Sequence, residues 1–436
     1  MKVLKFGGTS VGSVDNMKSV MQIITDGERK VVVLSAMSGT TNTLVEISEL
    51  LYKKKQKEAT KLIDKLEAKY NKVISQLYAS ADYKQKGAKH VKQVFETLKS
   101  YTTGEFDENG EKAILAQGEM MSTGMFHFLL LENGFKSALI PALDFMKIDE
   151  ELQPDLKYIT EHIEPIMADV ADADYVITQG YICLNADNNV DNLQRGGSDY
   201  TATLIGAAIN SEIVEIWTDI DGFHNNDPRY VENTAKINQL SFEEAAELAF
   251  FGAKILHPST ILPCKKRNVP VRLKNTMNPT DDGTLITHDP QGKGIKAIAA
   301  KDNIAAIKIK SDRMLNAHGF LRKVFEIFEN FKTPIDMITT SEVAVSCTID
   351  KMDYLEDILV DLESLGEVSI DTDQTIICIV GHDLIEEKGH QYRIFKALEK
   401  LPIRMISYGG SNHNISILTC REDKKEALNA LSKGLF

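Results

Sequence analysis

Two short glycine-containing segments carry residue types that suit phosphate and carboxylate chemistry. In the first, Lys5 stands at the end of an apolar run and is followed, after Phe6, by Gly7 and Gly8. Glycines let backbone N–H groups approach phosphate oxygens without a Cβ in the way. Because the lysine precedes the glycines, the segment is not a Walker A loop. Taken alone, it is also consistent with an ordinary turn between a strand and a helix.

The second segment has the sequence Gln-Arg-Gly-Gly-Ser-Asp at 194–199. Its two glycines again open the backbone, and Arg195 and Asp199 flank them. A guanidinium group matches a carboxylate with two parallel hydrogen bonds. The segment therefore suits carboxylate binding, although a surface turn with a salt bridge would have the same composition.

Two later segments add further candidates. One has the sequence Trp-Thr-Asp-Ile-Asp-Gly at 217–222 and is followed by Asp-Pro-Arg at 227–229. The other has the sequence Phe-Gly-Ala-Lys-Ile-Leu-His-Pro at 251–258. Lys254, at a predicted turn, can extend over a nucleotide. His257 precedes a proline in an apolar stretch, and we interpret it as structural.

Several of these segments end or follow predicted strands. Apolar runs at 3–6, 31–34, 175–180 and 213–219 finish in Gly, Ser, Thr or Asp, with helical stretches between them. Continuous apolar strands are typical of a parallel sheet that helices cover on both faces. The pattern therefore predicts an α/β domain, with ligands bound beyond the carboxyl ends of its strands.

The rest of the chain divides into an insertion and a repeat. Residues 54–100 keep helical spacing of apolar residues and predict an added helical hairpin. After a linker at 289–294, two β-α-β-β-α passages follow about 70 residues apart, as in ferredoxin-like units. The second passage lacks its fourth strand, which we expect from 295–300. The predicted domains are therefore an α/β domain at 1–290, a first ferredoxin-like unit at 304–372, and a second at 295–303 plus 373–436.

Composition excludes some classes of function. The 436 residues carry a formal net charge of −13, which argues against nucleic-acid binding. Anionic substrates would need cations gathered locally. The five scattered cysteines form no metal-binding pattern and fit a reducing cytosol. No signal peptide and no apolar run of membrane-spanning length is present, so we expect a cytoplasmic protein without a membrane partner.

Taken together and in this order, the motifs resemble the aspartate kinase branch of the amino-acid kinase family. The matching segments lie at 5–10, 34–42, 117–119, 178–182, 195–202, 218–222, 227–229 and 251–258. The resemblance covers essentially the whole chain and implies a three-layer α/β/α kinase domain followed by two ACT domains. Two positions depart from the family pattern: Asp-Asn-Leu-Gln at 191–194 replaces Thr-Thr-Leu-Gly, and His224 replaces a tyrosine that stacks on the nucleotide.

The resemblance also implies an activity and a role for each motif. The reaction would move the ATP γ-phosphate to the β-carboxylate of L-aspartate, the first step towards lysine, threonine and methionine. The catalytic residues would be Lys5, Asp199 and Lys254. ATP would be bound by Lys5, Phe6, Gly7, Gly8, Thr218, Asp219, His224, Arg229, Lys254 and Ile255. Aspartate would be bound by Ser35, Thr41, Glu119, Tyr181, Arg195 and Ser198. Mg²⁺ would bridge the phosphates through substrate oxygens and water, so no protein metal ligand is expected.

Two alternatives stay open. A related kinase could act on glutamate, acetylglutamate or a nucleotide, but Glu119 as an ammonium partner argues against an N-acylated substrate. A catalytically inactive amino-acid sensor would be expected to lack Lys5, Arg195 or Asp199, and all three are present. A fused homoserine dehydrogenase is not expected, because no dinucleotide fingerprint follows residue 300.

The regulatory ligand is predicted to be lysine, with threonine as the alternative. A Gly near a helix start offers free N–H groups to an α-carboxylate, and nearby acids and hydroxyls suit ammonium groups. The pattern resembles that of lysine-sensitive aspartate kinases and implies this effector set: Met314, Asn316, Gly319, Phe320, Leu321, Asp336, Thr340, Ser341 and Glu342. A homodimer or higher oligomer through the ACT domains is also expected.

Overall fold

The computed structural model describes residues 1–193, 196–252, 255–314 and 318–436. The chain forms two compact units. The first contains Met1–Gly222 and Leu256–Pro290, and the second contains Phe223–Ile255 and Gln291–Phe436. Three predicted site residues, Arg195, Lys254 and Asn316, lie outside the described residues, in the segments 194–195, 253–254 and 315–317.

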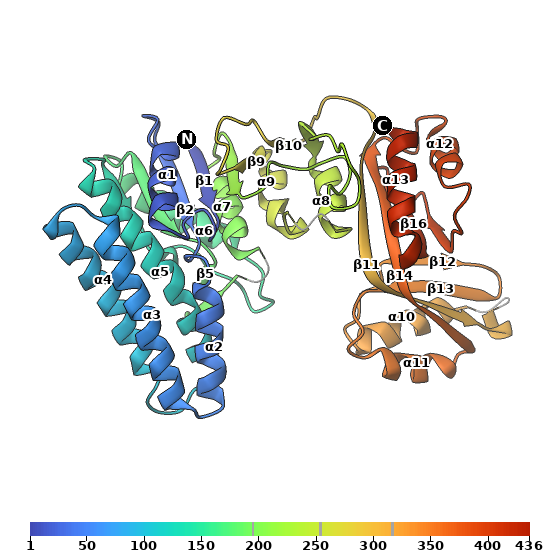
Figure 1. Ribbon diagram of the computed structural model, residues 1–436. Helices are drawn as coiled ribbons and strands as arrows, with labels where there is room; N and C mark the ends of the chain where they lie inside the picture. The colour runs from blue at the N-terminus through green and yellow to red at the C-terminus, as the bar shows by residue number, and fades with distance from the viewer. Residues whose placement is uncertain (194–195, 253–254, 315–317) are drawn as a thin grey trace. The chain divides into compact units, whose positions relative to one another are not determined.

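The first unit is built on a mostly parallel sheet (Figure 1). Its strands run in the order β3 (Ser137–Leu139), β4 (Tyr175–Gln179), β2 (Lys30–Leu34), β1 (Lys2–Phe6), β7 (Val214–Thr218), β9 (Val271–Asn275) and β10 (Thr284–Thr287). Neighbouring strands are parallel except β10, which is antiparallel to β9. The strands predicted at 3–6, 31–34 and 175–180 are therefore adjacent, and their carboxyl ends lie at one edge.

Helices cover both faces of this sheet, as a three-layer α/β/α fold requires. One core joins alternate strand residues such as Leu4, Phe6, Val32 and Leu34 to five helices. These helices are α1 (Val14–Ile24), α2 (Thr40–Tyr52), α3 (Gln56–Leu77), α4 (Ala81–Ser100) and α5 (Glu108–Glu132). Helix α7 (Gly197–Ala208) packs on β1, β2 and β7, and it also contacts α6 (Leu156–Asp169) and α9 (Leu262–Arg267). A small hairpin of β5 (Ile182–Leu184) and β6 (Val190–Asn192) precedes α7.

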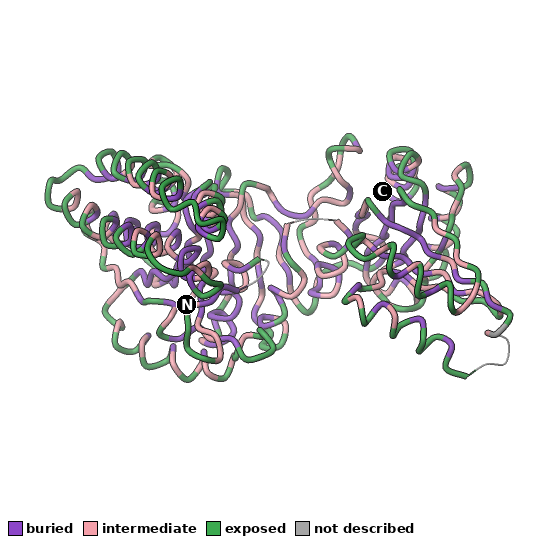
Figure 2. The backbone as a smooth tube through the Cα atoms, turned by 90° about the horizontal axis from the view of Figure 1, so that it is seen from below, coloured by how far each residue is buried: buried purple, intermediate pink, exposed green. Residues whose placement is uncertain are grey.

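The predicted helical hairpin is formed by α3 and α4. Along α3 the buried residues are Ala59, Ile63, Leu66, Tyr70, Ile74 and Leu77. This spacing places them on one side of the helix, and Figure 2 shows buried and exposed residues alternating along such helices. The hairpin joins the core of the first unit through this side.

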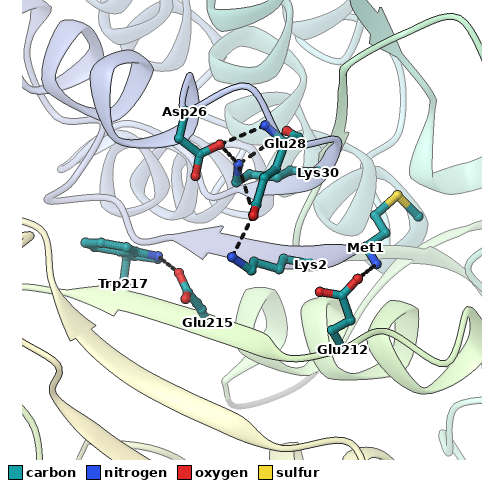
Figure 3. A network of polar contacts seen from close by, with 8 residues as sticks. All are labelled: Met1, Lys2, Asp26, Glu28, Lys30, Glu212, Glu215 and Trp217. Atoms are coloured by element: carbon teal, nitrogen blue, oxygen red, sulfur yellow. Dashed lines mark hydrogen bonds and ion pairs between the residues drawn. The ribbon is translucent and has the colours of Figure 1, made fainter.

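The amino ends of β1 and β2 carry a network of paired charges (Figure 3). Lys30 is only 2% exposed and donates to the Asp26 carboxylate and to the Glu28 carbonyl oxygen. Lys2 forms a 2.6 Å ion pair with Glu28. Both ammonium groups have partners within the protein, so we interpret them as structural. The candidate ligand site is at the opposite, carboxyl ends of the strands.

The second unit contains an antiparallel sheet in the order β12 (Met337–Thr340), β13 (Ala344–Ile349), β11 (Gly294–Lys310), β14 (Glu367–His382), β16 (Asn414–Cys420) and β15 (Met405–Ser407). Its helices are α8 (Phe242–Phe250), α10 (Phe320–Asn330), α11 (Leu355–Glu363), α12 (His390–Ala397) and α13 (Lys424–Leu435), and a short strand β8 (Gln239–Ser241) precedes α8. Two separate cores lie on this unit, one with α10 and α11 and one with α12 and α13.

The two long strands differ from the sequence prediction. Separate strands were expected at 295–300 and 304–310 and again at 367–371 and 375–380, but β11 and β14 are each continuous. Asp302 and Asn303 lie between the first two of these expected strands. The register shifts there between Lys301 and Ile304, and Asn303 takes a φ of 60°. A bulge of this kind lets a strand continue past an irregular residue.

Residues 295–300 pair with β14 in this sheet, opposite Gly381–Ile377. The second half of β11 pairs with both β13 and β14. The two expected regulatory units therefore share two strands. The segment Phe223–Ile255 was assigned to the predicted domain 1–290 because of its motifs, but it packs with the second unit. The predicted limits of the domains therefore differ from the limits of the two compact units, and they stay a prediction.

No helix of the described chain is both long enough and apolar enough to cross a membrane.

Candidate active site

A cavity of about 500 Å³ lies in the first unit, next to the carboxyl ends of β1 and β2. Its lining comes from loops that are far apart in sequence: Gly8, Thr9, Ser35, Ala36, Met37, Ser38, Gly39, Thr41, Asn42, Glu119, Tyr181, Gly197, Ser198 and Asp219. Seven of the predicted site residues are in this set: Gly8, Ser35, Thr41, Glu119, Tyr181, Ser198 and Asp219. The sequence prediction missed the others, although most lie inside the motifs that carry the family resemblance.

Lys5 is held at the edge of this region by Asp199. Its Nζ atom lies 2.7 Å from the Asp199 Oδ1 atom, and the lysine is 9% exposed. The two side chains therefore form a largely buried ion pair. Asp199 sits in the first turn of α7, so the helix fixes the position of the Lys5 ammonium.

Close packing requires the second glycine after Lys5. A Cβ at Gly8 would lie 2.9 Å from the Ala36 carbonyl oxygen, whereas one at Gly7 would make only an ordinary contact, 3.4 Å from the Lys5 Nζ atom. The loop after β1 therefore runs directly against the loop after β2, and Gly8 and Ser38 are also joined by a 3.1 Å backbone hydrogen bond. This contact leaves no room for a larger residue at position 8.

Two helix N-termini border the cavity without a side-chain cap. Gly39 precedes α2 with a φ of 79°, and Gly196 precedes α7 with a φ of 74°. The first N–H groups of a helix have no partner within the helix, and the helix dipole favours negative charge there. Thr41 and Ser198 belong to these first turns. The cavity therefore offers donors suited to phosphate or carboxylate oxygens.

Glu119, on α5, is the most perturbed acid of the cavity. Its side chain is 4% exposed, its Oε1 atom accepts a 3.0 Å hydrogen bond from the Ala36 N–H, and its Oε2 atom has no partner among the described residues. Burial raises its pKa to about 8, although the Ala36 hydrogen bond and the Lys5 charge act in the opposite direction. A cation brought next to Oε2 would favour the ionised carboxylate.

Tyr181 has a strained backbone at the cavity wall. Its φ is 71°, a left-handed conformation that residues other than glycine seldom adopt. Its N–H donates to the Thr201 hydroxyl at 3.0 Å, and a Cβ at Gly197 would lie 2.5 Å from its ring. Burial raises the pKa of Tyr181 to about 12. The tyrosine is therefore a neutral wall packed on the start of α7.

The predicted nucleotide residues divide between the two units. Lys5, Phe6, Gly7, Gly8, Thr218 and Asp219 belong to the first unit, and His224, Arg229 and Ile255 belong to the second. The Phe6 ring is fully buried and stacks on Trp217 with ring centroids 5.6 Å apart. Only the backbone of Phe6 is therefore available to a ligand, so its predicted role in ATP binding is limited to backbone contacts.

In the second unit, Arg229 is mostly exposed but already bound. Its Nε and Nη2 atoms donate to the two carboxylate oxygens of Asp227 at 2.9 and 2.6 Å. The His224 Nδ1 atom lies 2.9 Å from the Thr234 hydroxyl. A nucleotide contact by Arg229 would therefore compete with Asp227.

The predicted effector residues do not form a single cluster. Thr340 and Ser341 line a cavity of about 270 Å³ with residues such as Lys308 and Lys310. Gly319 precedes α10 with a φ of 84°, and the next residue, Phe320, is buried. Leu321 and Glu342 are exposed. Met314 packs against the core that contains α10. Asp336 does not line that cavity. Its side chain is 2% exposed, and its Oδ1 atom lies 2.9 Å from the Lys301 Nζ atom.

Comparisons with known proteins agree with this site. Residues 1–275 match the amino acid kinase family, and residues 377–435 match an ACT domain. The whole chain is 32% identical to the lysine-sensitive aspartokinase 3 of Escherichia coli, of which it covers 99%. It is also 32% identical to the chloroplastic aspartokinase 2 of Arabidopsis thaliana, of which it covers 84%.

Solved structures give the same result. The crystal structure of E. coli aspartokinase III in complex with aspartate and ADP matches over 100% of both chains, with 31% identity and a TM-score of 0.84. The aspartate kinase of Clostridium acetobutylicum also matches over 100% of both chains, with 26% identity and a TM-score of 0.86. The chain therefore belongs to the amino acid kinase family, as an ATP-dependent phosphotransferase of the aspartokinase group.

Proposed function

We propose that this enzyme transfers the γ-phosphate of ATP to the β-carboxylate of L-aspartate and forms 4-phospho-L-aspartate, the first step towards lysine, threonine and methionine. The observation that carries the proposal is the buried carboxyl of Glu119, a lining residue of the cavity whose Oε2 atom has no hydrogen-bond partner among the described residues. An amino acid with a free α-ammonium would supply the missing partner. The aspartokinases that match the full chain support aspartate as that amino acid.

In this proposal the substrate ammonium binds the Glu119 carboxylate and the substrate carboxylates bind cationic and N–H donors. Arg195 would hold one carboxylate by two hydrogen bonds. Ser35, Thr41 and Ser198 add hydroxyl groups, and the uncapped starts of α2 and α7 add backbone N–H groups. An N-acylated substrate lacks the ammonium and would leave Glu119 buried without a partner, which is costly.

Phosphoryl transfer needs position and charge more than covalent help from the protein. An oxygen of the β-carboxylate attacks the γ-phosphorus, the bond to the bridging oxygen breaks, and ADP leaves with the electron pair. Lys5 is the cation for the transferring phosphoryl oxygens, and Asp199 keeps it oriented. Thr218, Asp219, His224, Arg229, Lys254 and Ile255 would bind the nucleotide. Mg²⁺ would arrive with ATP, held mainly by phosphate oxygens and water.

A hydroxylamine trapping assay tests the proposal. An acyl phosphate reacts with hydroxylamine to give a hydroxamate, so ATP plus aspartate should produce aspartyl hydroxamate. We expect little product from glutamate and none from N-acetylated amino acids. ADP formation without hydroxamate, or a faster reaction with glutamate, would contradict the proposed acceptor.

The role of Arg195 can be tested by Arg195→Lys. Lysine cannot reproduce two parallel hydrogen bonds to a carboxylate. The KM for aspartate should therefore rise far more than the KM for ATP. Equal changes in both constants would place Arg195 at the phosphates instead.

We further propose that lysine inhibits the enzyme from the second unit, and that the protein works as a homodimer or higher oligomer through this unit. Support for lysine as the inhibitor comes from the E. coli aspartokinase III structure described as a complex with lysine and aspartate, which matches the full chain at 31% identity and a TM-score of 0.82. Thr340 and Ser341 line a cavity suited to polar groups. Titrating the activity with lysine and, separately, with threonine distinguishes the two candidate effectors.

A further inference from the structure

The segment 223–252 together with Ile255, here named the nucleotide segment, is built into the second unit. The Ile298 N–H donates to the Asn225 carbonyl oxygen at 2.9 Å, and the Asn226 amide donates to the Leu428 carbonyl oxygen at 3.2 Å. Val231 joins the core that contains Ile298 and Leu428. The predicted nucleotide residues His224, Arg229 and Ile255 therefore belong to the same packed body as the regulatory sheet.

Helix α8, inside the nucleotide segment, is also fixed to that sheet. Glu244 is fully buried and forms a 3.0 Å ion pair with Lys296 of β11, which is 10% exposed. The Asn414 amide of β16 donates to the Glu247 carboxylate. Beyond α8, Gly252 has a φ of 121°, and a Cβ there would lie 2.2 Å from the Ala300 carbonyl oxygen. The end of the segment is therefore pressed against β11 at Ala300.

The next residue of β11, Lys301, connects this contact to the predicted effector set. Its Nζ atom lies 2.9 Å from Asp336 Oδ1 and 2.8 Å from Asp350 Oδ2. The same ammonium lies 4.4 Å from the centroid of the Phe250 ring, at the end of α8. A cation over an aromatic face is attracted by the ring quadrupole. One ammonium group thus contacts both Asp336 and the nucleotide segment.

We propose that Lys301 is a positioning residue for nucleotide binding, and that an amino-acid effector acts by taking a share of the Asp336 carboxylate from it. The proposal rests on the proposed inhibition by an amino acid and on the effector role predicted for Asp336 from the sequence. The Asp336 Oδ2 atom is buried and has no hydrogen-bond partner among the described residues. An effector ammonium that reaches this oxygen weakens the hold of Asp336 on Lys301, and the change passes to Phe250 and the segment behind it.

The charges of the cluster favour a cation as the ligand. When both carboxyls are ionised, Asp336 and Asp350 carry two negative charges against one positive charge on Lys301. A second ammonium would bring the net charge of the cluster to zero. It would also repel the Lys301 ammonium, since both are positive, and the repulsion is strong because the site is largely buried and poorly screened. The ligand class is therefore an amino acid with a cationic side chain or a free α-ammonium, and lysine is the probe to use.

The decisive variant is Lys301→Met, which keeps much of the side-chain volume and removes the charge. The KM for ATP is measured with and without saturating lysine, and lysine binding is measured by calorimetry on the same full-length protein. In the wild type we expect lysine to raise the KM for ATP by about five-fold or more, within the usual range of coupling between sites. In Lys301→Met this ratio should fall close to one, while lysine still binds.

Three further variants separate this mechanism from a general loss of structure. Lys301→Arg keeps a cation and should restore part of the lysine response. Lys293→Met removes an exposed lysine that pairs with Asp383 near the start of β11, and its lysine response should equal that of the wild type. Phe250→Leu breaks the ring contact on a partly exposed residue and decides the question if Lys301→Met does not fold.

The outcomes are distinct. If lysine inhibits the wild type and the ratio of KM values is unchanged in Lys301→Met, or in Phe250→Leu when Lys301→Met is unfolded, this inference is wrong and the proposed function stands. If lysine neither binds nor inhibits the wild type, the effector assignment is wrong and the inference falls with it. A lost response with retained lysine binding supports the inference.

Discussion

Two buried lysine–aspartate pairs, one in each unit, have nearly the same geometry and different surroundings. Lys5 lies 2.7 Å from Asp199, and Lys301 lies 2.9 Å from Asp336. Lys5 stands beside glycine loops and uncapped helix starts, which favour anions. Lys301 has a second carboxylate, Asp350, at 2.8 Å. The charge around the pair, more than the pair itself, decides whether an anion or a cation is the ligand.

The largest effect is expected at the first pair. Lys5→Met removes the cation proposed to stabilise the transferring phosphoryl group, and loss of one such donor typically lowers kcat by about 10²–10³. Steady-state hydroxamate formation at saturating ATP and aspartate measures the change. A variant that folds and turns over at near-normal rate would remove Lys5 from the proposed mechanism.

The second pair should affect regulation instead. Asp336→Asn keeps the shape of the side chain and removes its charge, so lysine should lose most of its effect, a coupling factor of about 5–150 in typical systems. The inhibition curve for lysine is compared with that of Glu342→Gln, an exposed acid of the same predicted set. Unchanged inhibition in Asp336→Asn would show that this carboxylate does not serve the effector.

Glu119 sharpens the comparison, because it is a buried acid that has no paired lysine of its own. With a pKa of about 8, it is mainly protonated at pH 7 in the free enzyme. A substrate ammonium needs the ionised form, so binding of aspartate should release a proton, and its KM should fall by about ten-fold between pH 7 and pH 9. Glu119→Gln should bind aspartate weakly with little pH dependence.

The same pKa has a consequence for stability. The raised value means that the folded state holds the Glu119 proton between roughly pH 4.5 and pH 8, where the unfolded chain has released it. The contribution of Glu119 to the free energy of unfolding therefore falls as the pH rises through this window. Denaturant unfolding of wild type and Glu119→Gln at both ends of the window should show the slope only in the wild type. A slope of the same size in the variant would contradict the assigned pKa.

The smallest effect is expected where charges are paired at the other end of the strands. Lys2 and Glu28 form a partly exposed ion pair at the amino ends of β1 and β2, opposite the strand ends that border the cavity. Such pairs contribute about 0–1 kcal/mol, so Lys2→Met should lower the free energy of unfolding by at most about this amount and leave kcat unchanged. Thermal unfolding and the hydroxamate assay check both expectations. A large loss of activity would mean that the two ends of the sheet are not as independent as proposed.

The first unit could be predicted from sequence because each feature has a local signal. Apolar runs such as 31–34 end in small polar residues, and parallel strands bring those ends together. Most lining residues of the cavity therefore lie inside recognisable motifs. What local signals could not show is the ion pairing of Lys30 at the amino ends of the strands, since a lysine at a strand start is usually exposed.

The second unit was harder to predict because its decisive contacts are non-local. Two strands were expected on either side of 301–303, and only the pairing of β11 with β14 shows that one strand continues through these residues. Packing of Phe223–Ile255 against this sheet depends on contacts such as Asn226 with Leu428. Likewise Lys301 looks like a surface residue in sequence, and its position between two carboxylates appears only in the folded chain.

The most direct test compares Lys5→Met and Lys301→Met side by side in the hydroxamate assay, each titrated with lysine. The account predicts that Lys5→Met loses about 10²–10³ in kcat, and that Lys301→Met still forms aspartyl hydroxamate but no longer responds to lysine. Equal losses of kcat in the two variants, or an intact lysine response in Lys301→Met beside near-normal turnover in Lys5→Met, would contradict the division of roles between the two pairs.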